Sequence, residues 1–402
     1  MPMQPEPILV SIATTIDGVT LESSVGNIKI TTTHPEKCNF ANLCDYAAWY
    51  FLPVAMRLNR PLHIAGYGSS QTIINWQKLA EIWQSWLPGH FYATNLNFDQ
   101  VVLRAPKHQT TSPDLMFYSG GVDAAHLGLL HLQENKQQDL LTVHGMDYSL
   151  EDQQRFSALL SKTAIFAQEL STTRIIVKSD AYQLYNDLGV NLGRHHLNHI
   201  FALVGAGFFH SESYDNLILA DDEPLAAQFL SFPWGTNAVT NPLFDDGQTK
   251  LITQAQGVPR IEKLKLINSS ETALNSLAFC WNRKLQPVNC GVCEKCLRTK
   301  MLCLAEFGVV PDIFLDKAIP SNWIKTLNYR GAEGFFIVQE IFRIAQQTGN
   351  SILFPDFQKS LESVFRYHQI FRRVENIWPR FLRPGFVAQL AAKVATKFSG
   401  GM

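Results

Sequence analysis

The sequence has no long apolar run and few charged residues. Among its 402 residues, no stretch approaches the about 20 consecutive apolar residues that a membrane-spanning helix needs. The longest candidate, Ile200 to Phe209, stops at His210. Charged residues make up only 17%, and 34 Lys and Arg nearly balance 35 Asp and Glu. The resulting net charge of −1 argues against a protein that binds nucleic acid along its whole length.

The N-terminal segment and the number of cysteines favour a cytoplasmic protein over a secreted one. Residues 1–7 contain no Lys or Arg and lead into a polar β-like segment, so they do not look like a secretory signal. The chain has seven cysteines, an odd number, and four of them lie in one tight cluster. Without an export signal, this pattern favours a metal site over disulfides. We therefore expect a soluble, cytoplasmic protein.

Hydrophobic patterning divides the chain into three predicted domains. Residues 1–108 combine short β-rich runs with helical patterns, which indicates an N-terminal α+β domain. The polar segment Pro106 to Pro113 is the clearest linker. Between residues 114 and 304, short β-branched runs alternate with helices, which predicts an α/β domain with a parallel sheet and right-handed crossovers. Residues 305–402 are predicted to form a helical extension, including helices at Gly334–Thr348, Asp356–Arg373 and Phe386–Phe398.

A glycine-rich turn follows the first predicted strand of the middle domain. The sequence Ser119-Gly120-Gly121-Val122-Asp123 joins the strand Leu115–Tyr118 to a helix. Two glycines allow a tight turn that brings backbone N–H groups towards an anion, and the helix N-terminus adds further donors. Ser119 offers a hydroxyl to a phosphate oxygen, and Asp123 offers a carboxylate to Mg²⁺. The alternative is an ordinary glycine turn between a strand and a helix.

This turn resembles the Ser-Gly-Gly-x-Asp-Ser loop of the PP-loop (N-type) ATP pyrophosphatases. The resemblance implies a Rossmann-like core of the adenine nucleotide alpha hydrolase type, which binds ATP with Mg²⁺ and adenylates a substrate oxygen. By that resemblance, Ser119 and Asp123 are the catalytic residues, and Ser119, Gly120, Gly121, Val122 and Asp123 hold the phosphates. The family's final serine is replaced by Ala124, which removes one hydroxyl contact to phosphate.

Four cysteines further along the chain have the spacing of a zinc site. Cys280, Cys290, Cys293 and Cys296 form a C-x9-C-x2-C-x2-C pattern. Four thiolates suit tetrahedral Zn²⁺, and because no ligand position is left open to water, a structural role is favoured over a catalytic one. The alternatives are a redox dithiol or buried free cysteines. Cys303 is expected to be a core residue.

The loop and the cysteines together resemble the 7-cyano-7-deazaguanine synthase (QueC) family. The resemblance covers about Asp114 to Leu304 and implies that ATP and ammonia act on 7-carboxy-7-deazaguanine, a small-molecule substrate. The N- and C-terminal extensions have no counterpart in that family, which makes this chain a divergent, longer QueC-like protein. Such relatives occur in bacterial anti-phage gene clusters, so the resemblance also implies a role in antiviral defence.

Further candidate residues follow the predicted strands of the middle domain. Ligands of open parallel sheets bind at the carboxyl ends of the strands, which points to His144, Asp147, Asp221 and Asp222. The resemblance implies that His144 and Asp147 line the nucleotide pocket. Helix capping explains the aspartates equally well. The loop Ser231–Asp245 is a candidate substrate loop through Trp234, Thr236, Asn237 and Asn241, although turn chemistry explains the same residues.

The C-terminal region is basic and aromatic. From Ser321 to Met402 there are 11 Lys and Arg against 5 Asp and Glu. Nucleic-acid binding, a partner protein and an amphipathic membrane contact are three interpretations. The fourth is a helical face whose arginines are solvated over a Phe-rich core.

Two hypotheses for the function take precedence. The first is an ATP-dependent enzyme that forms AMP and pyrophosphate, adenylates a carboxylate and lets ammonia or an amine attack it. The alternative is a catalytically reduced nucleotide-binding subunit that scaffolds a protein complex through its extensions. A thiolation enzyme of RNA is less favoured, because no cysteine lies between Cys44 and Cys280.

Overall fold

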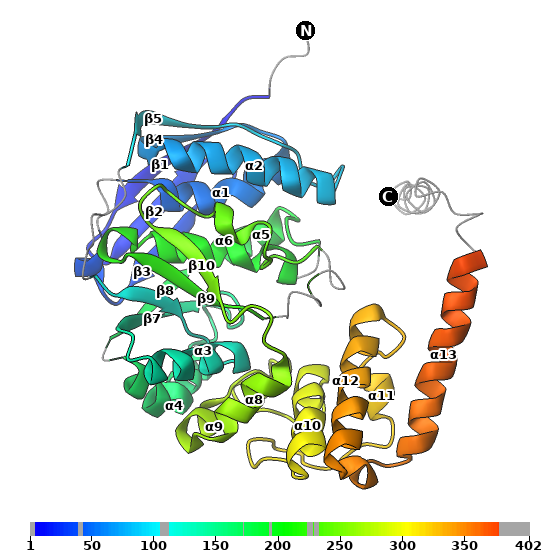
Figure 1. Cartoon of the computed structure of the whole chain (residues 1–402). Coiled ribbons are helices and arrows are strands. Elements are labelled where there is room, and N and C mark those ends of the chain that lie inside the picture. Colours follow the sequence, from blue (N-terminus) through cyan, green and yellow to red (C-terminus); the bar gives the residue numbers. More distant parts are fainter. Residues whose placement is uncertain are drawn as a thin grey trace. The chain divides into compact units, whose positions relative to one another are not determined.

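The computed structural model describes residues 5–38, 43–104, 112–171, 173–192, 195–222, 228 and 233–377. The chain divides into two compact units (Figure 1). The first contains the residues up to 296 together with 311–317, and the second contains residues 297–310 and those from 318 onwards.

The described residues of the first unit include one sheet of ten strands, in the order β10-β9-β6-β7-β8-β3-β2-β1-β4-β5. Their bounds are β1 Ile8–Thr14, β2 Gly18–Ser23, β3 Ile28–Thr32, β4 Leu62–Ser69, β5 Leu96–Val102, β6 Asp114–Phe117, β7 Gln138–His144, β8 Arg174–Ser179, β9 Asn216–Ala220 and β10 Lys250–Gln254.

The described α-helices of the first unit lie between or after these strands along the chain. They are α1 Asp45–Leu58, α2 Ser70–Trp86, α3 Val122–Gln133, α4 Gln153–Leu170, α5 Ala181–Asp187, α6 His195–Phe208, α8 Arg260–Asn268 and α9 Glu271–Ser276. Helix α10 Glu294–Phe307 begins in the first unit and continues into the second, which adds α11 Trp323–Thr326, α12 Ala332–Thr348 and α13 Phe357–Ile377. None of the helices described combines the length and apolar character needed to cross a membrane.

Five adjacent strands form a parallel, Rossmann-like half of the sheet. Strand β6 pairs in parallel with both β7 and β9, while β8 and β10 extend the sheet on either side. In chain order, the strands β8-β7-β6-β9-β10 run 3-2-1-4-5, which is the order of Rossmann-like folds. The predicted α/β class is therefore confirmed. The chain changes direction across the sheet between β6 and β9, where ligands of such folds bind.

The N-terminal strands continue the same sheet. Strand β3 pairs antiparallel with β8, so that Ile30 lies opposite Ser179 and Thr32 opposite Val177. Residues 1–108 and the middle region therefore share one sheet and one compact unit, whereas the sequence analysis predicted separate domains. Antiparallel pairing with a distant strand hides an edge of β8 that would otherwise be exposed. The predicted linker at Pro106–Pro113 lies mostly outside the described residues.

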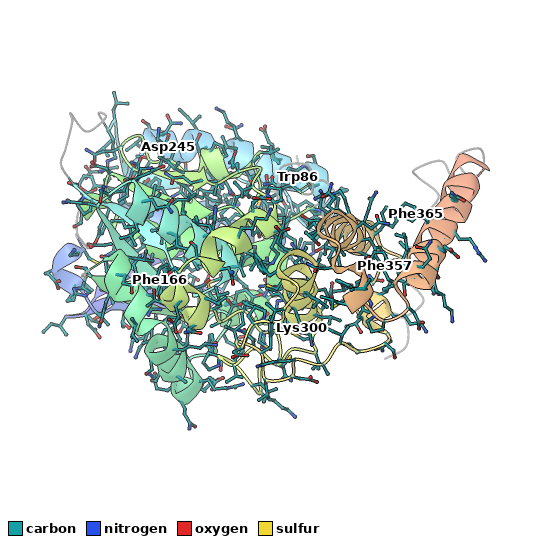
Figure 2. All side chains as sticks on the ribbon, turned by 60° about the horizontal axis from the view of Figure 1, so that its bottom comes forward. Trp86, Phe166, Asp245, Lys300, Phe357 and Phe365 are labelled. Carbon is teal, nitrogen blue, oxygen red and sulfur yellow. The ribbon has the colours of Figure 1, made fainter. Side chains whose placement is uncertain are left out.

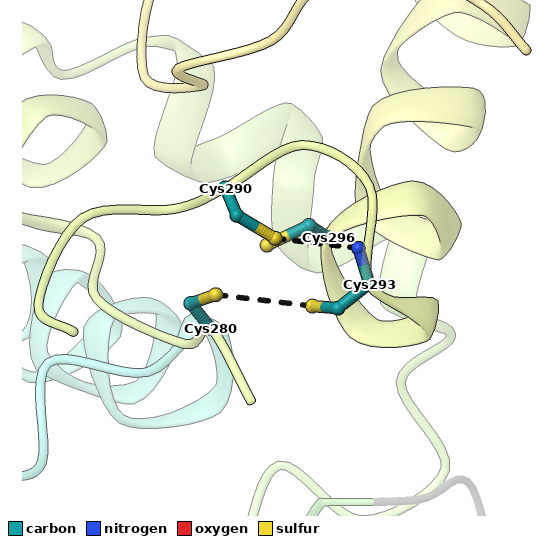
Figure 3. A group of neighbouring side chains, drawn as sticks. All are labelled: Cys280, Cys290, Cys293 and Cys296. Carbon is teal, nitrogen blue, oxygen red and sulfur yellow. Dashed lines mark hydrogen bonds between the residues drawn. The ribbon is translucent and has the colours of Figure 1, made fainter. Parts of the chain in front are cut away.

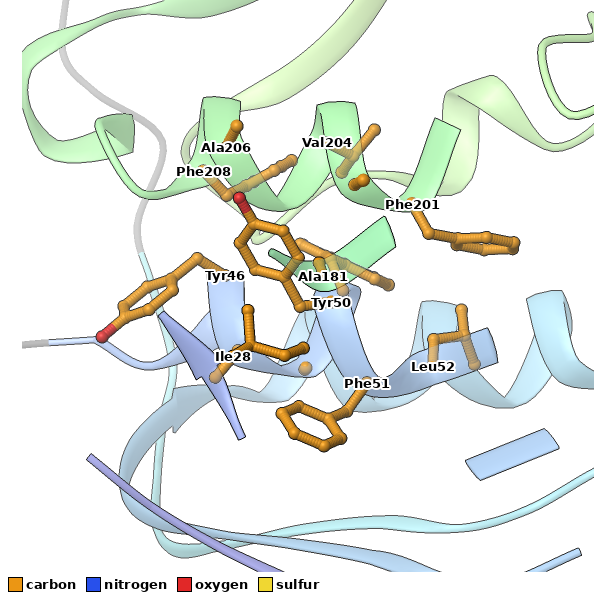
Figure 4. Packing of buried hydrophobic residues seen from close by; sticks show 14 of the residues in the cluster. Ile28, Tyr46, Tyr50, Phe51, Leu52, Ala181, Phe201, Val204, Ala206 and Phe208 are labelled. Carbon is orange, nitrogen blue, oxygen red and sulfur yellow. The ribbon is translucent and has the colours of Figure 1, made fainter. Parts of the chain in front are cut away.

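Helix α1 is buried on every side because it lies between the sheet and α6. All its residues from Asp45 to Met56 are buried. Figure 4 shows Tyr50 pointing towards α6 and Phe51 pointing to the opposite side of the helix. A helix that is apolar all round belongs in the interior of a large core, and this one joins the core of the N-terminal strands to that of the Rossmann-like half.

The second unit is a helical cluster with its own aromatic core. The Trp323 ring packs against Phe342 and Phe354, with centroids 5.6 and 5.7 Å apart. Phe357, at the start of α13, packs edge-on against Phe342 at 4.9 Å, whereas Phe365 further along α13 is 41% exposed (Figure 2). The predicted helices of this region are present up to Ile377. The predicted helix Phe386–Phe398 lies outside the described residues.

The segment that leads from Phe91 to β5 is irregular. Phe91 is buried in a loop, where its ring packs against Trp83 with centroids 5.8 Å apart, and β5 begins only at Leu96. Strands β4 and β10 and helices α8 and α9 were not predicted.

Replacement of Gly205 by alanine tests the close packing of α6 on α1. A Cβ atom at Gly205 would lie 2.5 Å from Cδ2 of the fully buried Tyr50 ring. We expect Gly205→Ala to lower the free energy of unfolding by about 1–3 kcal/mol in a urea titration. The steric cost exceeds the gain of up to about 1 kcal/mol in helix propensity.

Gly128→Ala in α3 is the matched control. The new Cβ would also meet an atom at 2.5 Å, but this atom is the end of the flexible Leu170 side chain, which can rotate away. We expect a smaller loss from this variant. Equal losses from both variants would contradict the proposed rigidity of the contact between α1 and α6.

Candidate phosphate loop and metal centre

The loop between β6 and α3 requires glycine at one position. Gly120 has a φ of +77°, and a Cβ atom there would lie 2.7 Å from Cγ2 of Thr163. Both the left-handed backbone and the neighbouring helix α4 therefore exclude a side chain. The loop lies at the carboxyl end of β6, beside the point where the strand order reverses.

The N-terminus of α3 has the donors of an anion site. Gly121 is the N-cap residue, and no side chain caps the helix. The first N–H groups of an α-helix have no partner within the helix, so those of Val122, Asp123 and Ala124 remain without one among the described residues. Ser119 is exposed, and its Oγ accepts a hydrogen bond of 3.3 Å from the Gly121 N–H. This arrangement suits a phosphate group.

Two buried cations face the carboxylate of Asp123. Lys263 Nζ lies 2.8 Å from Asp123 Oδ1, and an Arg260 guanidinium nitrogen lies 3.8 Å from Oδ2. Burial alone would raise the pKa of Asp123, but the charges of Lys263 and Arg260 outweigh it and lower the pKa. Because both carboxylate oxygens face cations, Asp123 does not offer the free ligand that the expected Mg²⁺ would need.

The sequence analysis missed Arg260 and Lys263 because helix α8 was not predicted. Both side chains lie in the first turn of α8, and both residues are at most 5% exposed. Cations are unfavourable near the N-terminus of a helix. Two basic residues three positions apart after Pro259 were therefore a usable signal that acidic partners lie nearby.

The carboxyl end of β9 brings two acidic residues to the same cluster. Lys263 Nζ donates to the backbone carbonyl of Asp221, and Gln228 Nε2 donates to Asp221 Oδ1 at 2.9 Å. Asp221 is 3% exposed, and its Oδ2 has no hydrogen-bond partner among the described residues. Burial, together with the nearby negative charge of Asp222, raises the pKa of Asp221 to about 7.

Two residues of the candidate substrate loop form hydrogen bonds with Asp222, the residue next to Asp221. Asp222 Oδ2 accepts hydrogen bonds from Trp234 Nε1 at 2.6 Å and from Thr236 Oγ1 at 2.9 Å. Asn237 Oδ1 instead accepts from the following turn, and Asn241 Oδ1 accepts from the Asn237 N–H. Asn241 Nδ2 also donates to Thr253 Oγ1 in β10 at 2.8 Å. Trp234 and Thr236 therefore lie by the aspartates that follow β9, while the two asparagines shape the turn.

His144 and Asp147 have different surroundings. The His144 ring is fully buried, stacks on Phe156 at 3.9 Å, and donates from Nε2 to the Ser149 carbonyl at 2.9 Å. Burial lowers the pKa of His144, which favours the neutral ring. Asp147 is exposed in the loop after β7. The structure thus places His144 in the core, where its hydrogen bond to the Ser149 carbonyl holds the loop that follows β7.

The four cysteines of the predicted zinc site lie together (Figure 3). All four Sγ atoms are within 4.8 Å of one another, and the Sγ atoms of Cys280 and Cys293 are 3.8 Å apart. A tetrahedral site with Zn–S bonds of about 2.3 Å has sulfur atoms about 3.8 Å apart. A disulfide would need about 2.05 Å. The cluster can therefore hold a metal ion such as zinc.

Backbone donors support the thiolate form of these cysteines. The N–H groups of Val292 and Cys293 donate to Cys290 Sγ at 3.4 and 3.3 Å, and the Asn282 N–H donates to Cys280 Sγ at 3.3 Å. Gly291 permits this turn with a φ of +81°, and a Cβ there would lie 2.0 Å from the Asp316 carbonyl oxygen. The donor set is that of a structural zinc knuckle.

One short segment connects the cysteines to the phosphate loop. The Ala278 N–H donates to the Gly120 carbonyl at 2.8 Å, two residues before Cys280. The fully buried Asn289 holds the same segment from the other side, because its amide bonds the Leu277 carbonyl at 2.8 Å and the Phe279 N–H at 3.0 Å. The position of Cys280 and the shape of the loop are thus coupled.

Comparisons with protein-family models, with curated proteins and with solved structures found no match to this chain. Its function is therefore inferred from the residues and their geometry.

Metal analysis tests the cysteine cluster. We expect the purified protein to contain about one zinc ion per chain by plasma mass spectrometry, since four thiolates at tetrahedral spacing bind zinc tightly. Cys290→Ser should lose most of the metal and melt at a lower temperature. Cys303→Ser is the control, because Cys303 is buried in the same helix as Cys296 but lies outside the group. Equal zinc in both variants would contradict the assignment.

The raised pKa of Asp221 predicts a pH-dependent stability. Because the folded protein holds this proton more tightly than the unfolded chain, the stabilising contribution is complete below about pH 4 and is lost as the pH rises through about 7. Asn cannot ionise, so the melting temperature of Asp221→Asn should exceed that of the wild type by an amount that grows between pH 5 and pH 8. Parallel melting profiles of the two proteins would show that Asp221 has an ordinary pKa.

Proposed function

We propose that this chain is an ATP-dependent enzyme of the PP-loop type. In this proposal it adenylates a carboxylate, releases pyrophosphate, and lets ammonia or an amine displace AMP to form a C–N bond. The observation that carries the proposal is the Ser119-Gly120-Gly121 turn at the strand-order reversal, with an uncapped helix behind it and an exposed serine in it. The resemblance to the 7-cyano-7-deazaguanine synthase family suggests a 7-deazaguanine carboxylate as substrate, and a role in anti-phage defence.

The residues around the loop suit phosphate chemistry. Backbone N–H groups of Val122 and Asp123 would hold phosphate oxygens, and the Ser119 hydroxyl would donate to another. Lys263 and Arg260 would balance the charge that develops on the departing pyrophosphate, because fixed cations in a shielded site stabilise such charge without rearrangement. Mg²⁺ that arrives with ATP would neutralise part of the phosphate charge. The zinc would act as a structural cross-link of the four thiolates.

A nucleotide-binding subunit without full activity is the second candidate. Asp123 is paired with Lys263 and Arg260, and Ala124 replaces the serine of the family pattern. Both observations favour a site that binds a nucleotide but turns it over poorly. In that case the terminal extensions would bind partner proteins of a complex.

Product analysis separates the two candidates. We expect incubation with ATP, ammonium chloride and 7-carboxy-7-deazaguanine to yield AMP, pyrophosphate and an amide or nitrile product by mass spectrometry. Pyrophosphate release should depend on the carboxylate substrate. ATP affinity without any turnover would support the nucleotide-binding subunit instead, and the absence of both binding and turnover would exclude both.

Gly120→Ala tests the phosphate loop itself. The Cβ would strain the backbone and press on Thr163, which would displace the loop N–H groups; loss of one such donor costs about 10²-fold in rate. We expect at least that decrease in pyrophosphate release. Gly89→Ala, in the turn after α2, is the matched control, because Gly89 has a similar φ of +80° but no atom within 4 Å of the new Cβ. An active Gly120→Ala protein would rule out the loop as the phosphate site.

A further inference from the structure

The first unit contains a pocket that has no role in the chemistry described so far. Its volume is about 390 Å³, within the range of about 300–1,000 Å³ that is usual for small-molecule sites. It lies at the carboxyl ends of β7 and β8, where it is lined by Gly145 and Met146 after β7 and by Asp180 and Tyr182 after β8. None of the loop residues 119–123 lines it.

The positive charge of this pocket belongs to an arginine that lies between two of the clustered cysteines. Arg283 lines the pocket and lies in the segment between Cys280 and Cys290. That segment is held by the hydrogen bond from the Asn282 N–H to Cys280 Sγ and by one of 2.6 Å from Gln286 Nε2 to the Cys280 carbonyl. The chain on both sides of Arg283 is therefore tied to Cys280. The segment that touches the phosphate loop at Ala278 reaches the pocket at Arg283.

The remaining polar groups of the pocket are acceptors and amides. Asp180 is fixed by a hydrogen bond of 2.7 Å from the Lys29 N–H to its Oδ1, and its side chain lines the pocket. Glu151 adds a second carboxylate, and Asn186 adds an amide. Carboxylates accept N–H donors, while a guanidinium binds a carboxylate through paired hydrogen bonds. The pocket thus matches a ring with N–H groups and a carboxylate.

We propose that this pocket binds the substrate of the reaction, a purine-sized heterocycle bearing one carboxylate. Arg283 pairs with the carboxylate, and Asp180 and Glu151 accept hydrogen bonds from ring N–H and amino groups. The inference rests on the proposed function, because it assigns the pocket to the compound that the phosphate loop would activate. In this assignment Arg283 determines specificity, and a metal bound by the cysteines would order the segment that carries it.

The test compares two ligands that differ only in charge. Binding of 7-carboxy-7-deazaguanine and of the uncharged 7-cyano-7-deazaguanine is measured by calorimetry without ATP, for the full-length wild type and for Arg283→Ala. We expect Arg283→Ala to weaken the carboxylate ligand about 10–100-fold and to leave the nitrile ligand within about 3-fold. Lys284→Ala, an exposed cation at the next position, is the matched control and should leave both affinities unchanged.

The possible outcomes separate the pocket from the proposed function. Equal losses for both ligands, no loss for either, or no binding to the wild type would each overturn the assignment. Weaker binding of a non-hydrolysable ATP analogue to Arg283→Ala, without the loss for the carboxylate, would assign the pocket to the nucleotide and overturn it as well. A charge-selective loss in a protein that never releases pyrophosphate would retain the pocket and refute the proposed enzyme.

Discussion

The hydrogen bond from the Ala278 N–H to the Gly120 carbonyl connects the two sites of the first unit. It fixes one side of the phosphate loop to the segment that carries Cys280, while Asn289 holds that segment from the other side. Because Gly120 has a left-handed backbone, its carbonyl direction is set by the turn. A metal site that rigidifies the segment would therefore keep the donors of the loop pointing outwards.

The charges at the strand-order reversal are balanced within the protein. Lys263 bridges Asp123 and the backbone of Asp221, so two of the three N–H donors of its buried ammonium are already bonded within the protein. An entering triphosphate would compete with Asp123 for this cation, and the released carboxylate would then face the phosphates. Moving a charge from water into a buried site costs much desolvation energy. Because Lys263 is already buried and paired, exchanging its partner costs less free energy than burying a new cation together with the phosphates.

Local patterns predicted the parts of the fold that depend on neighbouring residues. The short β-branched strands of the middle region and the tightly spaced cysteines are local signals, and the structure contains both. The pairing of β3 with β8 depends on distant residues, so the sequence analysis separated regions that share one sheet. At the site, Lys263 was missed because its helix has weak periodicity. His144 was chosen by its place after a strand, although stacking on Phe156 determines its surroundings.

The burial of α1 has a consequence for how the chain acquires its fold. During synthesis, α1 leaves the ribosome long before α6, the helix that covers its outer side. Until then, an apolar surface stays open to water, and contacts between distant segments form slowly. Such intermediates are prone to aggregation and are typical clients of chaperones. The N-terminal strands and α1 are thus synthesised early, but their core is complete only after the Rossmann-like half has been synthesised and has packed against them.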